Sequence, residues 1–362
     1  MTDTTDSRSI APLLAAGAGA YDERSVNDAG YYYDDIYEAV YLFAVGILGA
    51  FVNVFLVVCV VARKHLRRMT SAFIIHGCLL DVAKSGYCLP FATSLLKNSA
   101  PDFCATLGRS YVIIVTASGF NIVAMVCSEA YIFSEHNIGG DGKGSLACVV
   151  FGLFMVYIGS VIIHLGPTII GGEFSYNQPI GNCLFLYGTT KSYVVHAMWI
   201  VIMTMAMVGA VYYLVFFYRH VQANSTHRLA ALVRASIHIS RGDASDYNDS
   251  IRQLVQSSLS RARVLLVVTA VFVGCWYPLF ALTLVDPRFR QPTPAYKLLT
   301  FLACSHPALN PLVFLFFDRH ITVLRWCPAC RRSVPPHHRA ALVPRLPQVS
   351  TPPLKNAMQR TI

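Results

Sequence analysis

Residues 39–64 read AVYLFAVGILGAFVNVFLVVCVVARK, an apolar run followed directly by two basic residues. A transmembrane helix needs about 20 mostly apolar residues to cross the hydrocarbon core of a bilayer, and this run is long enough. Six further runs meet the same criterion. We therefore predict seven spans, at Ala39 to Ala62, Ala72 to Leu96, Phe103 to Ile132, Leu146 to Ile170, Tyr193 to Tyr218, Val264 to Leu284 and Leu298 to Phe317.

The composition supports a membrane protein. Hydrophobic residues make up 55% of the chain and charged residues only 13%, which is a poor fit to a soluble fold. The net charge of +10 comes from Lys and Arg clustered between apolar runs, a pattern that does not indicate nucleic-acid binding. The runs are continuously apolar rather than alternating, which excludes a spanning barrel. The predicted fold class is all-α, a seven-transmembrane helix bundle.

The basic residues also predict the orientation, because cytoplasmic loops carry an excess of Lys and Arg. They follow the first span, lie between the fifth and sixth spans, and follow the last span. With seven spans, the amino terminus is then extracellular. We expect a disordered extracellular tail at residues 1–36, a seven-helix domain at 37–320 and a cytoplasmic tail at 321–362. A leader peptide ending near Ala20 is disfavoured by Asp3 and Asp6.

Two charged residues, Asp81 and Lys84, lie inside the second predicted span. Ionisable groups at membrane depth are costly and mark functional sites by default. Because residues three apart share a helix face, one interpretation is an internal ion pair that lowers the cost of insertion. The other is a functional polar centre that also includes polar residues of neighbouring spans. The sequence leaves both open.

Several motifs recur in a specific order. The first span has Asn53, four residues after Gly49, and the second has Asp81. The sixth has Cys275-Trp276-Tyr277-Pro278, with Phe272 one turn earlier, and the last has Asn310-Pro311-Leu-Val-Phe314. Each fragment alone is common in membrane helices, but their order across seven spans is specific. From Tyr37 to about Cys330 the chain resembles the rhodopsin-like G-protein-coupled receptors, with Phe314 in place of their tyrosine.

The resemblance implies roles for these residues. Phe272, Trp276, Pro278, Asn310, Pro311 and Phe314 correspond to the activation switch of the family. Asp81, Ser118 and Asn310 correspond to a sodium site, whose oxygen ligands suit a hard cation. The ammonium group of Lys84, one turn away, is an alternative occupant.

The resemblance also implies a disulfide and a ligand pocket. The family joins the counterparts of Cys104 and Cys183, and the oxidising extracellular side favours this bond over free thiols. The expected ligand-binding residues are Tyr111, Val115, Trp276, Phe280 and Thr300, in a concave, mostly apolar pocket; helix packing is the alternative. Tyr111 stands where amine receptors carry aspartate, so biogenic amines are disfavoured.

An acidic aromatic strip, Tyr31-Tyr-Tyr33-Asp34-Asp35, precedes the first span. Acid-flanked tyrosines outside a cell are candidates for sulfation, and the strip would attract a basic peptide. An interfacial aromatic belt explains the tyrosines equally well.

The inner end of the third span departs from the family. It reads Glu129-Ala130-Tyr131, where the family has Asp/Glu-Arg-Tyr, whose arginine engages the G protein and restrains the sixth helix. Aligning the motif puts Ala130 at the arginine position, and counting from Cys104 puts Glu129 there. Neither residue replaces an arginine fork, so we expect altered coupling at this G-protein interface. The fourth span also lacks the family's tryptophan and has Tyr157 instead.

Two cytoplasmic segments add expectations. The spacing of Arg252 to Leu265 predicts a helix that extends the sixth span into the cytoplasm. Cys327 and Cys330 lie beside basic residues and are candidates for palmitoylation. A zinc site is the alternative, but no accompanying histidines support it.

The sequence thus predicts a plasma-membrane receptor. It would transduce an extracellular ligand, a peptide or another non-amine, to heterotrimeric G proteins and arrestin. The alternative is a receptor-like membrane binding or scaffold protein that does not activate G proteins. We expect no enzyme activity and no cofactor, since neither an HExxH motif nor a broken inverted repeat occurs.

Overall fold

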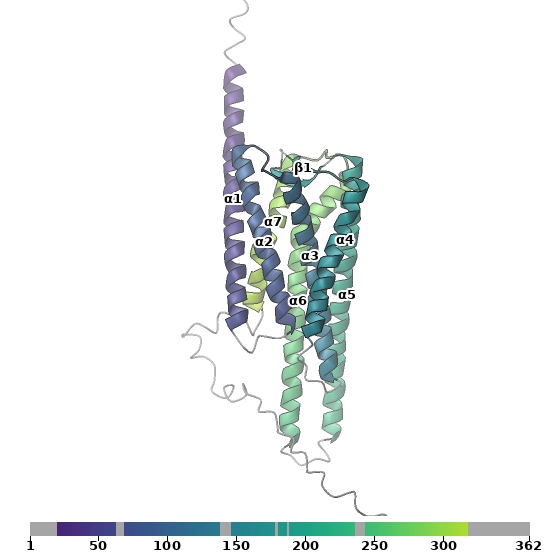
Figure 1. The fold of residues 1–362 in the computed structure, drawn as a ribbon. Helices are drawn as coiled ribbons and strands as arrows, with labels where there is room; N and C mark the ends of the chain where they lie inside the picture. Colours follow the sequence, from purple (N-terminus) through teal and green to yellow (C-terminus); the bar gives the residue numbers. More distant parts are fainter. Residues whose placement is uncertain are drawn as a thin grey trace, which may run out of the picture. The chain divides into compact units, whose positions relative to one another are not determined.

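The computed structural model of the protein describes residues 20–62, 69–137, 146–177, 180–186, 188–235 and 243–317. These residues form a bundle of seven helices with one small hairpin at its end (Figure 1). The elements are α1 (Ala20–Ala62), α2 (Met69–Lys97), α3 (Cys104–Asn137), α4 (Leu146–Ile170), β1 (Phe174–Asn177), β2 (Asn182–Phe185), α5 (Thr190–Ala235), α6 (Asp243–Val285) and α7 (Thr293–Phe317).

The predicted fold class is confirmed. Each predicted span coincides with one helix, apart from Phe103, which directly precedes α3. Seven helices in the described part of the chain are long and apolar enough to cross a membrane. Large apolar side chains cover the outside of the bundle, among them Phe51, Phe151 and Met205, each more than 60% exposed. A soluble protein rarely exposes so much contiguous apolar surface. The outer surface of the bundle therefore suits contact with lipid.

Three helices extend far beyond their predicted spans, and α2, α3 and α7 extend by only a few residues. α6 begins at Asp243, which confirms the predicted helical extension of the sixth span, and α5 continues to Ala235. α1 begins at Ala20, so residues 20–36, expected within a disordered tail, are helical. Adding a residue to an existing helix costs less than starting a new one, and no proline interrupts the chain between Ala20 and Tyr37.

The chain divides into two units, Met1–Ile321 and Thr322–Ile362. The second unit lies outside the described residues, as do residues 1–19 of the first. In the first unit, α3 is the central helix and contacts α2, α4, α5, α6 and both strands. α1 packs against α2 and α7, and α6 packs against α5 and α7.

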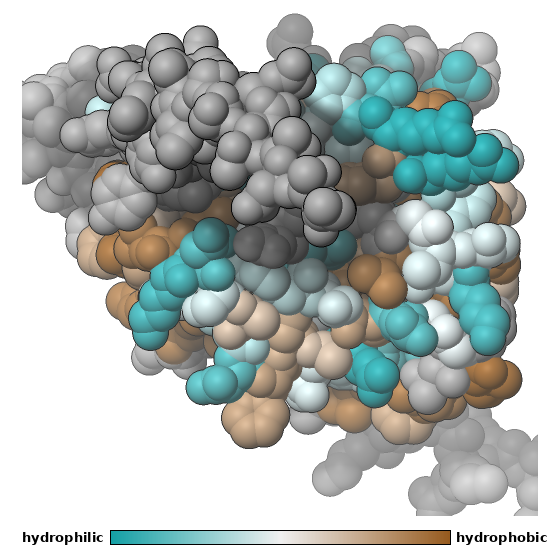
Figure 2. All heavy atoms as spheres, turned by 90° about the horizontal axis from the view of Figure 1, so that it is seen from above, coloured by the Kyte–Doolittle hydropathy of each residue, from teal (hydrophilic) through white to brown (hydrophobic). Residues whose placement is uncertain are grey.

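The hairpin between α4 and α5 is absent from the sequence-based expectations. Its two strands pair antiparallel, with Phe174 opposite Phe185 and Tyr176 opposite Cys183. Gly181 in the turn has a φ of 74°, and a Cβ there would overlap the Leu95 side chain, so only glycine fits. Figure 2 views the bundle from this end, where hydrophilic side chains are mixed with hydrophobic ones.

A disulfide joins the hairpin to the bundle. It links Cys104, the first residue of α3, to Cys183 of β2, with 5.3 Å between the two Cα atoms. One turn further along α3, a Cβ at Gly108 would overlap the backbone carbonyl of Cys183. The strand therefore lies directly on α3. The disulfide implied by the resemblance is confirmed.

We expect Cys104→Ser and Cys183→Ser to destabilise the protein equally, because either change removes the same bond. Loss of a native disulfide costs about 2–5 kcal/mol, measurable as a lower thermal midpoint of the purified protein and as lower surface expression. Cys127→Ser, at an exposed free cysteine, is the matched control. Normal expression and stability of both single variants would contradict a structural role for the bond.

Asp286 organises the turn between α6 and α7. Its carboxylate accepts hydrogen bonds from the backbone N–H groups of Arg290 (2.9 Å) and Gln291 (2.8 Å) and from the Tyr296 hydroxyl (3.1 Å). Desolvation raises the pKa of Asp286, but these hydrogen bonds and the charge of Arg290 lower it more. The net pKa therefore lies below the ordinary aspartate value.

This lowered pKa predicts a pH dependence. A carboxylate with a lowered folded-state pKa contributes stability that is present above its unfolded pKa, about 4, and is lost as pH falls through the folded pKa. We expect Asp286→Asn to lower the thermal midpoint at neutral pH, and the difference from the native protein to shrink below about pH 4. Asp102→Asn, at an exposed aspartate before α3, is the control. A difference that is unchanged down to the folded pKa would refute the ionic contribution.

Candidate functional site

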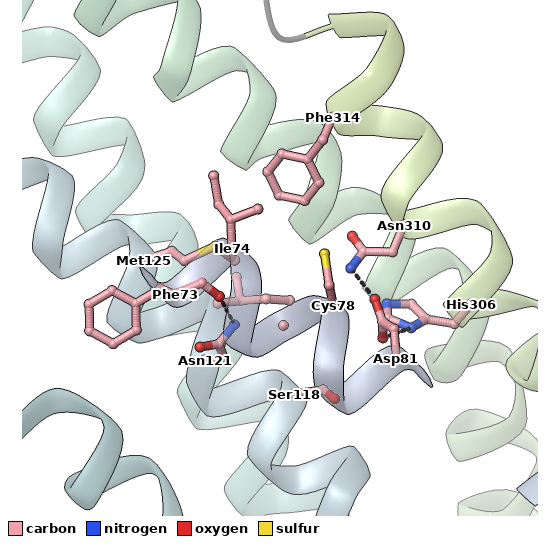
Figure 3. A pocket seen from close by; sticks show the side chains of 12 residues that line it. Phe73, Ile74, Cys78, Asp81, Ser118, Asn121, Met125, His306, Asn310 and Phe314 are labelled. Carbon is pink, nitrogen blue, oxygen red and sulfur yellow. Dashed lines mark hydrogen bonds and ion pairs between the residues drawn. The ribbon is translucent and has the colours of Figure 1, made fainter. Parts of the chain in front are cut away.

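A cluster of polar side chains lies between α2 and α7 in the middle of the bundle (Figure 3). Asp81 is 1% exposed, and Asn310 donates a hydrogen bond from Nδ2 to its Oδ2 at 2.6 Å. The other carboxylate oxygen, Oδ1, lies 2.6 Å from Nζ of Lys84. Both Asp81 oxygens therefore have a partner, as a buried carboxylate requires. We call Asp81, Lys84, His306 and Asn310 the polar centre.

Lys84 connects α2 to α7. Its side chain is fully buried, and Nζ lies 3.0 Å from Nδ1 of His306 as well as beside Asp81. An ammonium group can only donate, so Nδ1 of His306 accepts this bond. The internal ion pair between Asp81 and Lys84 is present, and it belongs to a wider cluster of polar side chains from α2 and α7. A functional role for this cluster stays a prediction.

Asn53 brings α1 into contact with the same region. Its Nδ2 donates to the backbone oxygen of Gly49 at 2.8 Å and to that of Pro307 at 2.7 Å. Pro311 removes the backbone donor that an unbroken helix would direct at the Pro307 carbonyl. The asparagine of α1 therefore binds a carbonyl that a proline in α7 has released.

A cavity of about 20 Å³ lies next to the polar centre. Its walls include all three residues expected to hold sodium, Asp81, Ser118 and Asn310, together with Cys78, Asn121 and Phe314. Ser118 donates from Oγ to the backbone oxygen of Ile114 at 2.9 Å. A cavity of this size accommodates one water-sized species.

Two of the residues expected to form the activation switch, Phe272 and Trp276, lie in a series of ring contacts. The rings of His306 and Phe272 meet edge to face, with 5.3 Å between their centroids. The ring centroid of Phe272 is 6.4 Å from that of Trp276, and the Trp276 centroid is 6.0 Å from that of Tyr111. A chain of ring contacts therefore runs from the polar centre on α7 through α6 to α3.

The residues expected to bind ligand lie on the hairpin side of these ring contacts. Tyr111, Val115, Trp276 and Phe280 line a cavity of about 10 Å³. Thr300 is not on its wall, although its buried Oγ1 has no hydrogen-bond partner in the described part of the protein. The structure thus brings four of the five residues together.

Sequence reasoning missed three aromatic residues on the same wall: Phe185, His196 and Trp199. Phe185 is 2% exposed, and its ring is 4.8 Å from that of His196. Trp199 donates from Nε1 to Oγ1 of Thr116 at 2.8 Å. The position of Phe185, two residues after Cys183, was an available signal. Trp199 had none, because it lies among the apolar residues of the membrane-spanning part of α5. We call these three residues with Phe280 the aromatic plug.

At the other end of the bundle, an ion pair joins α3 to α6. Nη1 of Arg261 lies 3.2 Å from Oε2 and 3.4 Å from Oε1 of Glu129. Glu129 is 4% exposed, whereas the Arg261 side chain is 17% exposed. Of the other residues expected at this interface, Ala130 is half-buried against the core and Tyr131 is 46% exposed.

The family model for the seven-transmembrane receptors of the rhodopsin family matches residues 52–314, more than half of the 362-residue chain. The chain belongs to the rhodopsin family of seven-transmembrane receptors. Squid rhodopsin has the same fold, with a TM-score of 0.66 at 15% identity over 83% of this chain and 85% of that one.

Relatives of this receptor are distant. The rat (Rattus norvegicus) alpha-1D adrenergic receptor is 22% identical over 72% of this chain and 52% of its own length. The bovine (Bos taurus) adenosine receptor A2b is 21% identical over 79% of this chain and 87% of its own length. The chain spans about half the length of the adrenergic relatives that it matches.

Tyr157, where the resemblance implies a tryptophan in the fourth span, takes part in a series of hydrogen bonds. Asn121 donates from Nδ2 to the backbone oxygen of Phe73 at 3.0 Å, and its Oδ1 lies 2.9 Å from Nδ1 of His76. An amide oxygen only accepts, so Nδ1 carries the proton and Nε2 accepts from the Tyr157 hydroxyl at 3.0 Å. Tyr157 thus ties α4 to α2 and α3.

Some expected sites lie outside the described residues. These are the palmitoylation candidates Cys327 and Cys330. For Tyr31 to Asp35 the backbone is helical, but the side chains are outside the described part of the receptor.

We expect Phe185→Ala to open a cavity in the aromatic plug. Truncating a buried phenylalanine costs about 3–5 kcal/mol, and an apolar cavity of this kind binds small aromatic molecules. The thermal midpoint should fall, and millimolar indole should restore part of it. Phe103→Ala, at a phenylalanine that is 84% exposed, should do neither. An equal response of the native receptor to indole would contradict the proposed role of Phe185 as a space-filling group.

Proposed function

We propose that this receptor transduces an extracellular ligand that is not an amine to heterotrimeric G proteins and arrestin, and that the Glu129–Arg261 pair controls its coupling. The second half of this proposal rests on a single observation. A buried glutamate on α3 binds an arginine on α6, while neither residue that aligns with the family's arginine, Glu129 or Ala130, can supply one.

The walls of the pocket support a ligand other than an amine. An amine would need an acidic counter-ion, and the residues that line the cavity around Tyr111 and Trp276 include no Asp or Glu. The names of several relatives indicate adrenergic ligands, but Tyr111 cannot pair with a cationic amine as aspartate does. The pocket therefore suits an apolar or aromatic group.

A peptide is the ligand class that the amino-terminal segment favours. Tyr31-Tyr-Tyr33-Asp34-Asp35 combines aromatic and acidic residues, and sulfation of these tyrosines would add negative charge. Such a strip attracts basic partners and raises their association rate. An aromatic residue of the peptide would then enter the bundle beside Trp276.

Two observations support an extracellular amino terminus and a place in the plasma membrane. The disulfide at the hairpin end of the bundle needs an oxidising compartment, and the amino-terminal part of α1 lies at this same end (Figure 1). The basic residues Arg261 and Arg263 lie at the start of the membrane-spanning part of α6, toward the opposite end, as expected for a cytoplasmic face. Acylation of Cys327 and Cys330 would anchor the tail to this face.

The Glu129–Arg261 pair lies where the resemblance implies an arginine on α3 that restrains α6. The family places an arginine on α3, whereas here α3 carries the acid and α6 the arginine. An ion pair still holds the cytoplasmic ends of these two helices together. Breaking a pair that contains a buried carboxylate leaves an uncompensated charge, so the pair favours the state in which α3 and α6 are close. Separation of the two helices would free Arg261 for a partner.

We expect Glu129→Gln and Arg261→Gln each to raise the basal population of the separated state, because each removes the ion pair. A coupling free energy of about 1–3 kcal/mol corresponds to a change of about 5- to 150-fold. The measurements are spin-label distances between α3 and α6, and basal G-protein activation and arrestin recruitment in cells, tested over all G-protein classes. Arg263→Gln, at an exposed arginine two residues away, is the matched control.

The exchanged variant Glu129→Arg/Arg261→Glu restores a pair with the family's polarity. It should return the α3–α6 distance to the native value, while Glu129→Arg alone should not. Unchanged distances in both single variants would refute the restraint.

The same cell assay distinguishes a signalling receptor from the alternative, a receptor-like scaffold. A receptor-like scaffold that does not activate G proteins is favoured by the missing arginine. It would give no signal from the native chain or from any of these variants, Ala130→Arg included, despite normal surface expression.

A further inference from the structure

The polar centre contains its own cation. The Lys84 side chain is fully buried, and its Nζ lies 2.6 Å from Oδ1 of Asp81. Lys84 and Asp81 are on the same helix, three residues apart, so the ammonium group is covalently attached to the element that carries the carboxylate. It cannot diffuse away from its partner as a free ion can.

The oxygen atoms around the adjacent cavity resemble a sodium site in kind. Asp81 offers a carboxylate, Ser118 a hydroxyl and Asn310 an amide oxygen, Oδ1, which is buried without a hydrogen-bond partner among the described residues. The cavity of about 20 Å³ has room for one small ion or water. Ligand type and space therefore agree with a hard cation.

The charge of the site, in contrast, does not suit a sodium ion. Asp81 is the only acidic residue on the cavity wall, and Lys84 already compensates it. A sodium ion would add a second positive charge beside an ammonium group in an enclosed, apolar part of the bundle, where like charges repel strongly. Because burial of an uncompensated charge is costly, the residues present do not fit a metal ion together with Lys84.

The ammonium group also makes the connection that a metal would make. An ion held by Asp81 and Asn310 would bridge α2 and α7. Nζ of Lys84 bridges the same two helices, since it lies 3.0 Å from Nδ1 of His306 on α7. Meanwhile Asn310 still donates directly to Asp81 at 2.6 Å. Two contacts from α2 to α7 thus exist without an ion.

We infer that the Lys84 ammonium group replaces sodium as the permanent counter-ion of Asp81, which makes the receptor insensitive to sodium. A diffusible ion stabilises whichever state binds it in proportion to its concentration. A tethered ammonium has no such dependence. Removing the amine should therefore create a sodium site from Asp81, Ser118 and Asn310.

The test compares thermal midpoints of the purified, detergent-solubilised receptor in sodium chloride and in choline chloride at equal ionic strength. The native receptor should unfold at the same temperature in both salts. Lys84→Leu leaves Asp81 without a counter-ion, so its midpoint should be higher in sodium chloride by about 3 °C. Lys84→Gln, which keeps a hydrogen-bond donor but no charge, should behave in the same way.

Two controls define the site. Lys97→Leu, at an exposed lysine of the same helix, should resemble the native receptor. Asp81→Asn/Lys84→Leu removes both charges and should lose the sodium effect. No signalling measurement is involved, so failure of this inference is distinguishable from failure of the proposed function.

The remaining outcomes each decide the question. A sodium-specific rise in the native midpoint would overturn the inference, because the ammonium group would then not exclude the ion. Equal midpoints of both Lys84 variants in the two salts would also overturn it. Folding of a Lys84 variant in sodium chloride alone would support it strongly. If both variants fail to fold in either salt while Asp81→Asn/Lys84→Leu folds, sodium cannot replace the ammonium group and the inference is wrong.

Discussion

Asp81 is a carboxylate enclosed in an apolar helix bundle, where it is stable only with a positive charge and hydrogen-bond donors beside it. Lys84 supplies the charge at 2.6 Å, and Asn310 donates the hydrogen bond from α7. Lys84 also reaches His306, one helical turn from Asn310. These contacts fix α7 against α2, and Asn53 adds α1 by binding the Pro307 carbonyl. The need to compensate one buried charge therefore sets the position of α7 against α2, and a separate hydrogen bond from Asn53 adds α1.

The same requirement acts where α3 meets α6 at the other end of the bundle, with a different result. Glu129 is also buried, but its partner, Arg261, lies on another helix and is partly exposed. Helix separation gives both charges access to water, whereas the partner of Asp81 lies on the same helix and moves with it. The Glu129–Arg261 pair is therefore suited to open and close, whereas the polar centre is suited to remain intact. The ring contacts from His306 through Phe272 to Trp276 connect the polar centre to α6, the helix that carries Arg261.

Sequence patterns predicted the fold because apolar length and basic flanks are local properties of each span. They predicted the Asp81–Lys84 pair for the same reason, since the two residues share a helix face. The partner of Glu129 was not predictable, because several arginines precede the sixth span and only packing selects Arg261. The aromatic plug was missed because Trp199 is one aromatic residue in an apolar helix and Phe185 belongs to a hairpin that no span pattern indicates. Helix ends were misplaced where polar segments continue an established helix, as in α1 and α5.

Three departures from the family pattern can be compared by what surrounds them. Lys84, beside Asp81, contacts His306 on α7, and Glu129 contacts Arg261 on α6. Tyr157 forms a hydrogen bond with His76, which in turn forms one with Asn121. A substitution that merely removed a family contact would leave a buried polar group without a partner, at a cost of about 1–3 kcal/mol each. Here each departure has a partner on a second helix. Agreement of this kind across separate sites characterises a sequence that specifies one structure. It favours a receptor whose interhelical contacts have been rebuilt with different chemistry over one whose contacts have been lost.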